Sequence, residues 1–282
     1  MGKLIDGKLI AQKIEAKTAQ RVANLKKKKI TPTLAVFLVG ADKPSQTYVR
    51  KKGEAAKRLG INFILKELKE KISTKALVKQ IKLAQKIKNL SGLIVQLPLP
   101  DNIDTGLVLN AINPQFDVDC LTDANIGKMV MGTNTIAPPT PGAALAVLKD
   151  LGIDLIGKNV TIIGMGPLVG KPLAILLMNE RASVTTCNSK TRDVKSKCLK
   201  ADIIVTGVGK KDILRGDMVS PGAIVIDTGV NFVDGKMYGD VNVTEVLKKA
   251  KFVTPTPGGI GPITVAMLLW NTVMGAEQNI YS

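Results

Sequence analysis

The 282-residue chain contains no histidine. This absence excludes serine–histidine triads, histidine-ligated metal sites and acid/base catalysis by an imidazole ring. Any proton transfer must therefore use lysine, carboxylate, tyrosine or cysteine side chains. We expect no metal ion in the functional site.

Cysteine is scarce: Cys120, Cys187 and Cys198 are far apart, odd in number and form no CxxC pair. They cannot make a disulfide framework, which indicates a protein of the reducing cytoplasm. No apolar run approaches the roughly 18 residues that suggest a membrane helix. The N-terminus interleaves charged with apolar residues, so it lacks the continuous apolar core of a signal peptide.

Aromatic residues make up only 3% of the chain, whereas the net charge is +17. The charge raises nucleic-acid binding as a possibility to weigh, but few aromatics are present to stack on bases. The lysines are spread along the chain, and the densest run is only Lys26 to Lys29. We expect a lysine-rich solvated surface without specific nucleic-acid binding. A non-catalytic protein that binds nucleotides or nucleic acid stays open as an alternative.

Apolar runs typical of strands alternate with amphipathic runs typical of helices, which predicts an α/β fold with mainly parallel sheets. The prolines and polar residues of 131–142 indicate a connection between two domains. The last helix is expected to begin after Pro262 and to run towards residue 279. The expected strands lie near 34–39, 61–66, 92–96, 183–187, 202–206 and 223–227. The other expected helices lie near 45–59, 74–88, 103–112 and 142–151, and residues 158–178 are expected to form a strand, a glycine turn and a helix.

Three glycines, Gly164, Gly166 and Gly170, lie between a β-branched strand and an apolar helix. Their G-x-G-x-x-x-G spacing is one residue longer than the usual dinucleotide fingerprint. Glycines here let the backbone approach a pyrophosphate, and the helix N-terminus adds positive potential. The pattern favours a nucleotide site, with a tight structural turn as the alternative.

The end of the following strand bears on the choice of cofactor. NAD sites usually have an acidic residue there for the ribose hydroxyls, but this chain has Ser189 and Lys190 and no acid. A hydroxyl and an ammonium group suit a 2′-phosphate, which favours NADP over NAD. Both could also be ordinary loop residues.

Tyr48 and Lys52 are four residues apart in a helix-compatible segment, so their side chains share one helical face. An aromatic ring beside an amine could hold a flat heterocycle and move a proton on it. Tyrosine and lysine at this spacing are also a common surface pair, so the segment needs support from elsewhere in the chain.

That support comes from the order of several segments. The chain carries, in order, YVRKK from Tyr48, VQLPLP from Val95, DVDC from Asp117, IIGMGPLVGKP from Ile162, VTTCNSKT from Val184, GAIVIDTGVN from Gly222 and PTPGGIGPIT from Pro255. Over essentially its whole length the sequence resembles the bifunctional methylenetetrahydrofolate dehydrogenase/cyclohydrolase family. The resemblance implies oxidation of methylenetetrahydrofolate by NADP and hydrolysis of the product to 10-formyltetrahydrofolate, in one-carbon metabolism.

The resemblance also implies an architecture. A catalytic domain (1–137 plus 264–282) would bind folate, and a Rossmann-like domain (138–263) would bind NADP. The folate would lie in the cleft between them, and homodimers would form through the nucleotide domain. The positive charge would suit polyglutamylated folates. Two variants stay open: an enzyme with little cyclohydrolase activity and an enzyme that uses NAD.

Roles for single residues follow from the same resemblance. Lys52 matches a catalytic lysine, whose pKa a cationic folate would lower, and Gln96 matches the glutamine that holds it. Tyr48 matches a residue that packs on the folate, and Asp119 matches the carboxylate that binds the pterin. The implied cofactor contacts are Gly164, Met165, Gly166, Ser189, Lys190 and Val230. The implied folate loop comprises Pro257, Gly258, Gly259, Gly261, Pro262 and Thr264.

The chain departs from the family pattern at three positions. Met165 and Gly166 replace the arginine and serine common in the nucleotide loop, which leaves the use of NAD or of both cofactors open. Asn188 replaces a common histidine. Cys120 replaces a glycine after DVD, and a positive φ there would cost about 1–2 kcal/mol.

Overall fold

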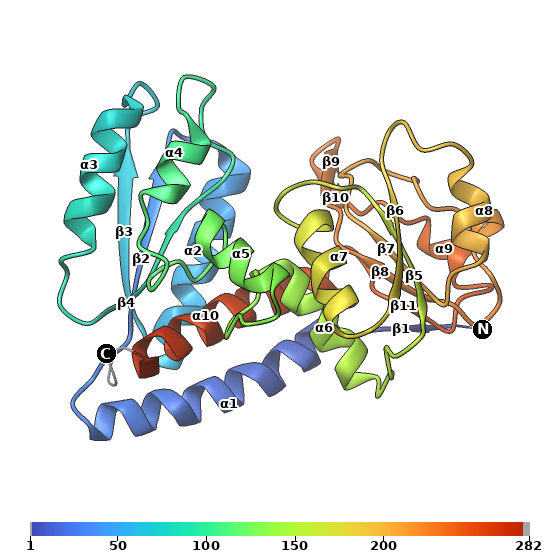
Figure 1. The fold of residues 1–282 in the computed structure, drawn as a ribbon, viewed down its shortest axis with the longest axis horizontal. Coiled ribbons are helices and arrows are strands. Elements are labelled where there is room, and N and C mark those ends of the chain that lie inside the picture. Colours follow the sequence, from blue (N-terminus) through green and yellow to red (C-terminus); the bar gives the residue numbers. More distant parts are fainter. Residues whose placement is uncertain (1, 279–282) are drawn as a thin grey trace. The chain divides into compact units, whose positions relative to one another are not determined.

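The computed structural model describes residues 2–278. Its contacts divide the chain into two compact units (Figure 1). The three-stranded unit comprises Lys13–Pro139 and Val265–Ser282, and the six-stranded unit comprises Met1–Gln12 and Thr140–Thr264. No helix of the described part of the chain is long and apolar enough to cross a membrane.

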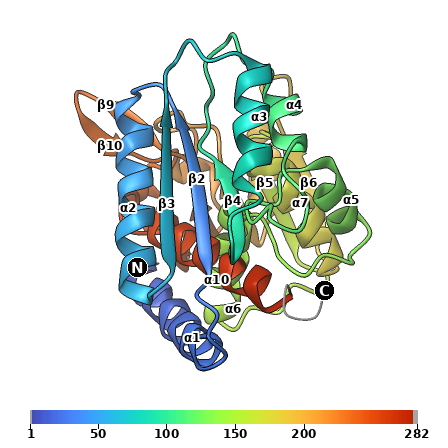
Figure 2. The same cartoon turned by 90° about the vertical axis from the view of Figure 1, so that its left-hand side faces the viewer.

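The three-stranded unit is built on a parallel sheet with the order β3-β2-β4. The central strand β2 (Thr33–Val39) is buried along its whole length, with β3 (Asn62–Leu68) and β4 (Leu90–Val95) on either side. Figure 2 shows the three strands side by side. Both faces of β2 are covered, which explains why its sequence is continuously apolar rather than alternating.

Two apolar cores lie on opposite faces of this sheet. On one face, Leu34 and Val36 of β2 pack with side chains of α1 (Gly7–Lys27), α2 (Lys43–Leu59) and α10 (Ile260–Gln278). On the other face, Ala35 and Phe37 pack with α3 (Thr74–Ala84) and α4 (Thr105–Asn110). A further helix, α5 (Asp123–Val130), follows the aspartate-rich turn. Successive side chains of a strand point to opposite faces of the sheet, so alternate residues of β2 enter the two cores.

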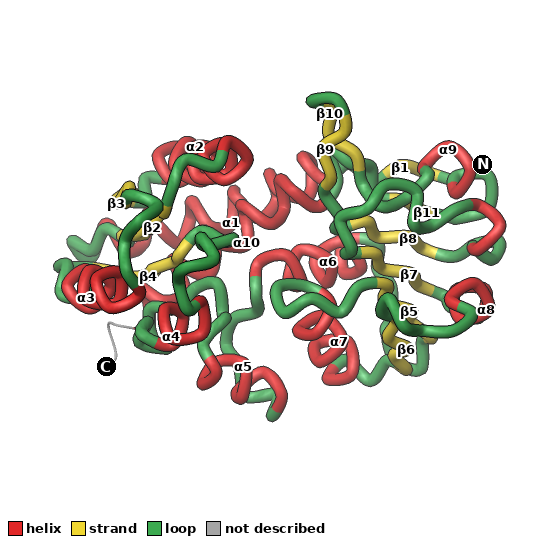
Figure 3. Tube along the Cα trace, turned by 90° about the horizontal axis from the view of Figure 1, so that it is seen from above, coloured by secondary structure: helices red, strands yellow, loops and turns green. Residues whose placement is uncertain are grey.

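The six-stranded unit contains a parallel sheet with the order β1-β11-β8-β7-β5-β6, which can be followed strand by strand in Figure 3. Its strands are β1 (Lys3–Leu4), β5 (Asn159–Ile163), β6 (Ser183–Cys187), β7 (Ile203–Thr206), β8 (Ile224–Asp227) and β11 (Phe252–Val253). A separate antiparallel hairpin pairs β9 (Asn231–Val233) with β10 (Lys236–Tyr238).

Helices cover both faces of the six-stranded sheet. Helices α6 (Pro139–Asp150) and α7 (Gly170–Asn179) lie on one face, and α8 (Val194–Leu199) and α9 (Val243–Val246) lie on the other (Figure 3). A 3₁₀ turn, η1 (Gly216–Met218), contacts α8 and α9. The predicted α/β class with two mainly parallel sheets is therefore confirmed.

The structure also contains elements that the sequence prediction left out: α1, α5, α8, α9, the hairpin and both short strands β1 and β11. Pairing of β1 with β11 places the first residues with the six-stranded sheet, whereas 1–137 was expected to form one domain. The last helix begins at Ile260, before Pro262 and not after it. Its predicted end near residue 279 lies outside the described residues.

Candidate active site

The three-stranded unit brings together Lys52, Gln96 and Asp119, which are far apart in the sequence. Helix α2 carries Lys52, and its start is fixed by Asp42, whose side chain accepts a hydrogen bond from the Ser45 amide at 2.9 Å. Gln96 directly follows β4, and its backbone N–H continues the ladder to the Phe37 carbonyl. The carboxyl ends of parallel strands meet at one edge of a sheet, so Gln96 lies at an edge suited to binding.

Lys52 and Gln96 are in direct contact. The Lys52 ammonium group donates to Gln96 Oε1 at 2.9 Å, and Gln96 Nε2 donates to the Leu97 carbonyl at 2.8 Å. The second hydrogen bond fixes which end of the amide faces the lysine, since only the oxygen can accept. Gln96 therefore holds the lysine nitrogen in place without giving it a counter-charge.

Charge and burial act in opposite directions on this pair of ionisable groups. Burial lowers the pKa of Lys52, and the negative charge of Asp119 partly offsets that effect. Burial raises the pKa of Asp119 to about 6, while Lys52 lowers it and Asp117 raises it. Burial also raises the pKa of Tyr48, whose ring is half-buried on α2. The site therefore favours a neutral lysine amine more than solvent does.

The two aspartates of DVDC have different surroundings. Asp117 is buried and accepts hydrogen bonds from the Thr122 amide at 2.8 Å and the Thr122 hydroxyl at 2.7 Å, which closes the turn. Asn125 donates to the same carboxylate at 3.0 Å. Asp119 is only half-buried. The first carboxylate thus shapes the turn, and the second takes no part in those hydrogen bonds.

Cys120 adopts φ 58°, so the position after DVD does require a left-handed backbone. A non-glycine residue with this angle costs about 1–2 kcal/mol. The side chain is buried, and burial raises the pKa of its thiol to about 12. Cys120 is therefore an unreactive packing residue beside Asp119.

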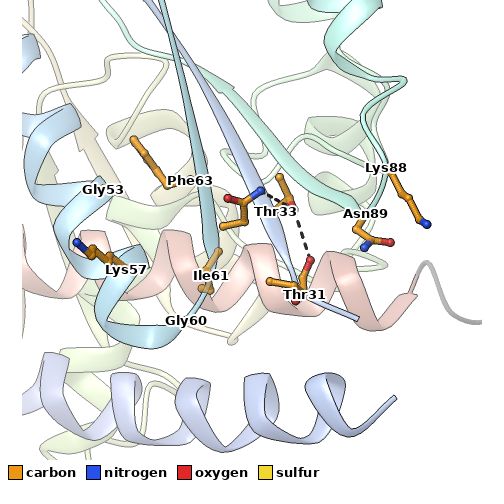
Figure 4. Close-up of a pocket in the computed structure, with 10 residues that line it drawn as sticks. Thr31, Thr33, Gly53, Lys57, Gly60, Ile61, Phe63, Lys88 and Asn89 are labelled. Carbon is orange, nitrogen blue, oxygen red and sulfur yellow. Dashed lines mark hydrogen bonds between the residues drawn. The ribbon is translucent and has the colours of Figure 1, made fainter. Parts of the chain in front are cut away.

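A surface cavity of about 720 Å³ lies at the other edge of this sheet (Figure 4). Thr33 and Asn62, which begin β2 and β3, line it. Lys57 and Lys88 lie at opposite ends of the cavity, and their ammonium groups point apart (Figure 4). The two cations do not converge on one ligand, so this cavity is not the candidate active site.

The six-stranded unit holds the predicted glycine turn between β5 and α7. Gly164 has φ 102°, and a Cβ built on it would lie 2.5 Å from the Gly207 carbonyl oxygen. A Cβ at Gly170 would overlap the Gly164 carbonyl, whereas one at Gly166 would meet nothing within 4 Å. Gly164 and Gly170 thus allow a tight approach of strand and helix, and the space above Gly166 stays open. Such a turn at a helix N-terminus fits a dinucleotide pyrophosphate.

The other predicted cofactor residues lie on loops that follow strands of the same sheet. Ser189 and Lys190 are exposed after β6, in a turn closed by a hydrogen bond from the Lys190 amide to Asn188 Oδ1 at 2.8 Å. Arg192, which the sequence prediction did not consider, is exposed in the same loop, just after the turn. Val230 follows β8 and is 39% exposed. Met165 is half-buried in the glycine turn.

The predicted folate loop also belongs to the six-stranded unit. Gly258 has φ 102°, and its carbonyl accepts from the Gly7 amide at 3.0 Å. A Cβ on Gly7 would overlap the Gly259 carbonyl, so these backbones pack closely. Thr264 Oγ1 lies 3.3 Å from Thr140 Oγ1. Pro257, Gly261 and Pro262 complete the loop and the first turn of α10.

Comparison with known proteins decides the family. Residues 5–119 match the tetrahydrofolate dehydrogenase/cyclohydrolase catalytic domain, and residues 138–280 match the NAD(P)-binding domain of the same family. The chain belongs to the tetrahydrofolate dehydrogenase/cyclohydrolase family. This confirms the resemblance inferred from the sequence.

Individual relatives of the family cover nearly the whole chain. The bifunctional protein FolD of Campylobacter concisus is 44% identical over 279 residues, with 99% of each chain covered. The solved FolD structure from Campylobacter jejuni is 40% identical with a TM-score of 0.96 and covers 99% of this chain and 100% of that one. The Trypanosoma brucei enzyme, solved with NADP and an inhibitor, is 34% identical with a TM-score of 0.96. The match covers 100% of this chain and 99% of that one.

Proposed function

We propose that the chain oxidises 5,10-methylenetetrahydrofolate to the 5,10-methenyl compound with NADP and then hydrolyses that compound to 10-formyltetrahydrofolate. The observation that carries the hydrolytic step is the contact between Lys52 Nζ and Gln96 Oε1 at 2.9 Å. Membership of the tetrahydrofolate dehydrogenase/cyclohydrolase family supports both steps.

In the hydrolytic step Lys52 acts as general base. Its lowered pKa increases the fraction of neutral amine, which takes a proton from water as the water oxygen bonds to the methenyl carbon. The bond from that carbon to N5 then breaks, and N5 takes the proton that Lys52 holds. The hydroxyl left on the carbon loses its own proton to solvent as it becomes the formyl carbonyl on N10, so one proton is released overall. Gln96 positions the amine throughout, because its oxygen accepts from Lys52 while its nitrogen is held by the Leu97 carbonyl.

Binding of the folate falls to Asp119 and Tyr48. The Asp119 carboxylate can accept two parallel hydrogen bonds from the aminopyrimidinone edge of the pterin, and the Tyr48 ring offers an apolar face for packing. In the first step, bound NADP would accept the hydride that leaves the methylene carbon. The loop Pro257–Thr264 presents mostly backbone and proline surface, which suits close approach of a flat ring.

The cofactor is tested by absorbance of the reduced nicotinamide, with methylenetetrahydrofolate and either NADP or NAD. Turnover with NADP alone is expected, because Ser189, Lys190 and Arg192 are exposed in one loop and offer a hydroxyl and two cations to a 2′-phosphate. Equal turnover with NAD would show that Met165 and Gly166, in place of arginine and serine, relax this choice. Absence of turnover with both would contradict the proposed oxidation.

A dehydrogenase with weak hydrolytic activity is the second candidate. The Lys52–Gln96 hydrogen bond argues against it, since this pair serves the water step. Loss of methenyltetrahydrofolate absorbance without cofactor measures hydrolysis alone and separates the two candidates.

Replacement of Asp119 with asparagine gives a pH test. The rate of hydrolysis should increase with pH as Lys52 loses its proton. Loss of the charge that raises the pKa of Lys52 should move this increase to lower pH. The KM for folate should increase about 10- to 100-fold, as expected for a lost charged hydrogen bond. Asp101→Asn, on an exposed loop, serves as control and should leave both values unchanged. A rise that stays in place or moves to higher pH would refute the coupling of Asp119 to Lys52.

The same variant has a predicted effect on stability. Because the folded-state pKa of Asp119 is raised to about 6, above its unfolded value, its ionisation destabilises the fold as pH rises through that window. Asp119→Asn should therefore increase the free energy of unfolding at pH 7, and the gain should disappear at about pH 3 and below, where the carboxyl is mostly protonated in both states. Denaturant titrations at the two pH values measure it.

Polyglutamylated folates are the proposed form of the substrate, supported by the net charge of +17. Affinities for mono- and pentaglutamate folate, compared at low and high salt, should differ more at low salt. Equal affinities for the two folates would count against a preference for polyglutamylated substrate.

A homodimer formed through the six-stranded unit is also proposed. Its hairpin exposes Phe232 (47%) and Val233 (37%), apolar side chains suited to an interface. Light scattering should give twice the chain mass of 30.0 kDa.

A cytoplasmic location is proposed because all three cysteines are unpaired and buried. Cell fractionation tests it.

A further inference from the structure

Asp240 is a buried carboxylate that none of the proposed catalytic steps uses. It is fully buried, between β10 and α9. Its two oxygens each accept from backbone: the Val208 amide donates to Oδ2 at 2.6 Å and the Lys210 amide donates to Oδ1 at 2.8 Å. Burial raises the pKa of Asp240, and hydrogen bonds from these amides and that of Gly209 lower it. The carboxylate therefore clamps one short loop, 207–210, at both ends.

The clamped loop forms a wall of the glycine turn. The Gly207 carbonyl oxygen is the atom that a Cβ on Gly164 would meet at 2.5 Å, and Val208 Cγ2 would lie 3.1 Å from the same Cβ. The Val208 side chain is 46% exposed, although it is apolar. A buried polar anchor thus holds an exposed apolar side chain beside the turn that suits a pyrophosphate.

The next loop along the sheet packs closely against Asp240. A Cβ on Gly229 would overlap the Asp240 carboxylate, and Gly229 immediately precedes Val230. The Val230 carbonyl oxygen would lie 3.4 Å from a Cβ on Gly209. Asp240 is thus hydrogen-bonded to the loop that carries Val208 and packed against the loop that carries Val230.

A second buried carboxylate, Asp227, completes the arrangement. It accepts from the Thr206 hydroxyl at 3.0 Å, the Gly229 amide at 2.9 Å and the Val241 amide at 3.1 Å. Burial raises its pKa to about 6, while the backbone amide of Asp240 lowers it and the charge of Asp240 raises it. The two carboxylates together tie the ends of β7 and β8 to the segment that follows β10.

We propose that Asp240 is a positioning residue of the dinucleotide site, which holds loops 207–210 and 229–230 so that Val208 and Val230 pack on the cofactor. This rests on the proposed assignment of the glycine turn to the cofactor. Asp240 touches no reacting atom and acts through the backbone of these loops.

Asp240→Asn tests the assignment with little change of shape. An amide has one accepting oxygen and one donating nitrogen, so one backbone N–H would face another donor and lose its partner. We expect the KM for NADP to rise about 10- to 100-fold, the size of one lost charged hydrogen bond, while the kcat for oxidation changes by less than about threefold. Asp212→Asn, exposed just beyond the loop, is the matched control and should keep the parental KM.

Two further readouts keep the result interpretable. Hydrolysis of the methenyl compound needs no NADP, so it should stay near the parental rate in Asp240→Asn. Amide hydrogen exchange should quicken in 207–210 and stay slow in β5, β7 and β8. An unchanged KM for NADP would overturn the proposal, and so would fast exchange throughout the sheet, because that would show general unfolding. Failure of the parental enzyme to reduce NADP would instead overturn the proposed cofactor site.

Discussion

Replacing Lys52 with methionine is expected to lower the rate of methenyltetrahydrofolate hydrolysis by about 10²- to 10⁴-fold, the contribution typical of one general base. Methionine has similar length and keeps the packing of the stem, but it cannot take a proton. Gln96 Oε1 would lose the donor that lies 2.9 Å away. The decay of methenyl absorbance, followed without cofactor, measures the effect.

Lys51→Met is the matched control for this change. Lys51 is the neighbouring lysine on α2, and it is exposed. The control should hydrolyse at the parental rate, because it removes the same charge from the helix without touching the site. Parental hydrolysis in Lys52→Met would show that Lys52 is not the base, and equal losses in both variants would point to overall charge.

The second large effect is expected for Gly164→Ala. At φ 102° an alanine is strained, and its Cβ would meet the Gly207 carbonyl oxygen at 2.5 Å, so the backbone must shift. Strain and overpacking together should lower the free energy of unfolding by about 2–4 kcal/mol. A displacement of about 1 Å in a binding loop costs about 100-fold in rate, and we expect that loss in kcat/KM for oxidation.

Gly166→Ala provides the comparison, because a Cβ there meets nothing within 4 Å. It should keep the parental stability in a denaturant titration. Any rise in the KM for NADP would then indicate that the cofactor occupies the space next to Gly166. Equal destabilisation by both alanines would show that the turn does not distinguish the two glycines.

Much of the fold could be predicted because strong local patterns agree with the tertiary structure. The continuous apolar run of β2 and the alternation of strands with amphipathic helices determine parallel sheets covered on both faces. The missed helix α1 also carried a signal: Ile10, Ile14, Thr18, Val22 and Leu25 recur every three or four residues. Lysines between them, and a threonine on the buried face, weakened that pattern.

The site was predictable only in part. The family resemblance implied that Gln96 hydrogen-bonds Lys52, and the structure contains that hydrogen bond, whereas the roles of both residues stay predictions. Asp240 could not be found this way, because its partners are the backbone amides of Val208 and Lys210, which any residue type could supply. The two-residue strands β1 and β11 are likewise too short to leave a pattern of their own.

The packing of glycines against buried carboxylates has a consequence for how this sequence can diverge. Gly229 leaves room for Asp240, and Gly239 leaves room for Asp227, since a Cβ on either glycine would overlap the carboxylate concerned. A single replacement at any of the four positions creates either a collision or an unsatisfied amide. We therefore expect descendants of this chain to inherit both glycines and both aspartates together.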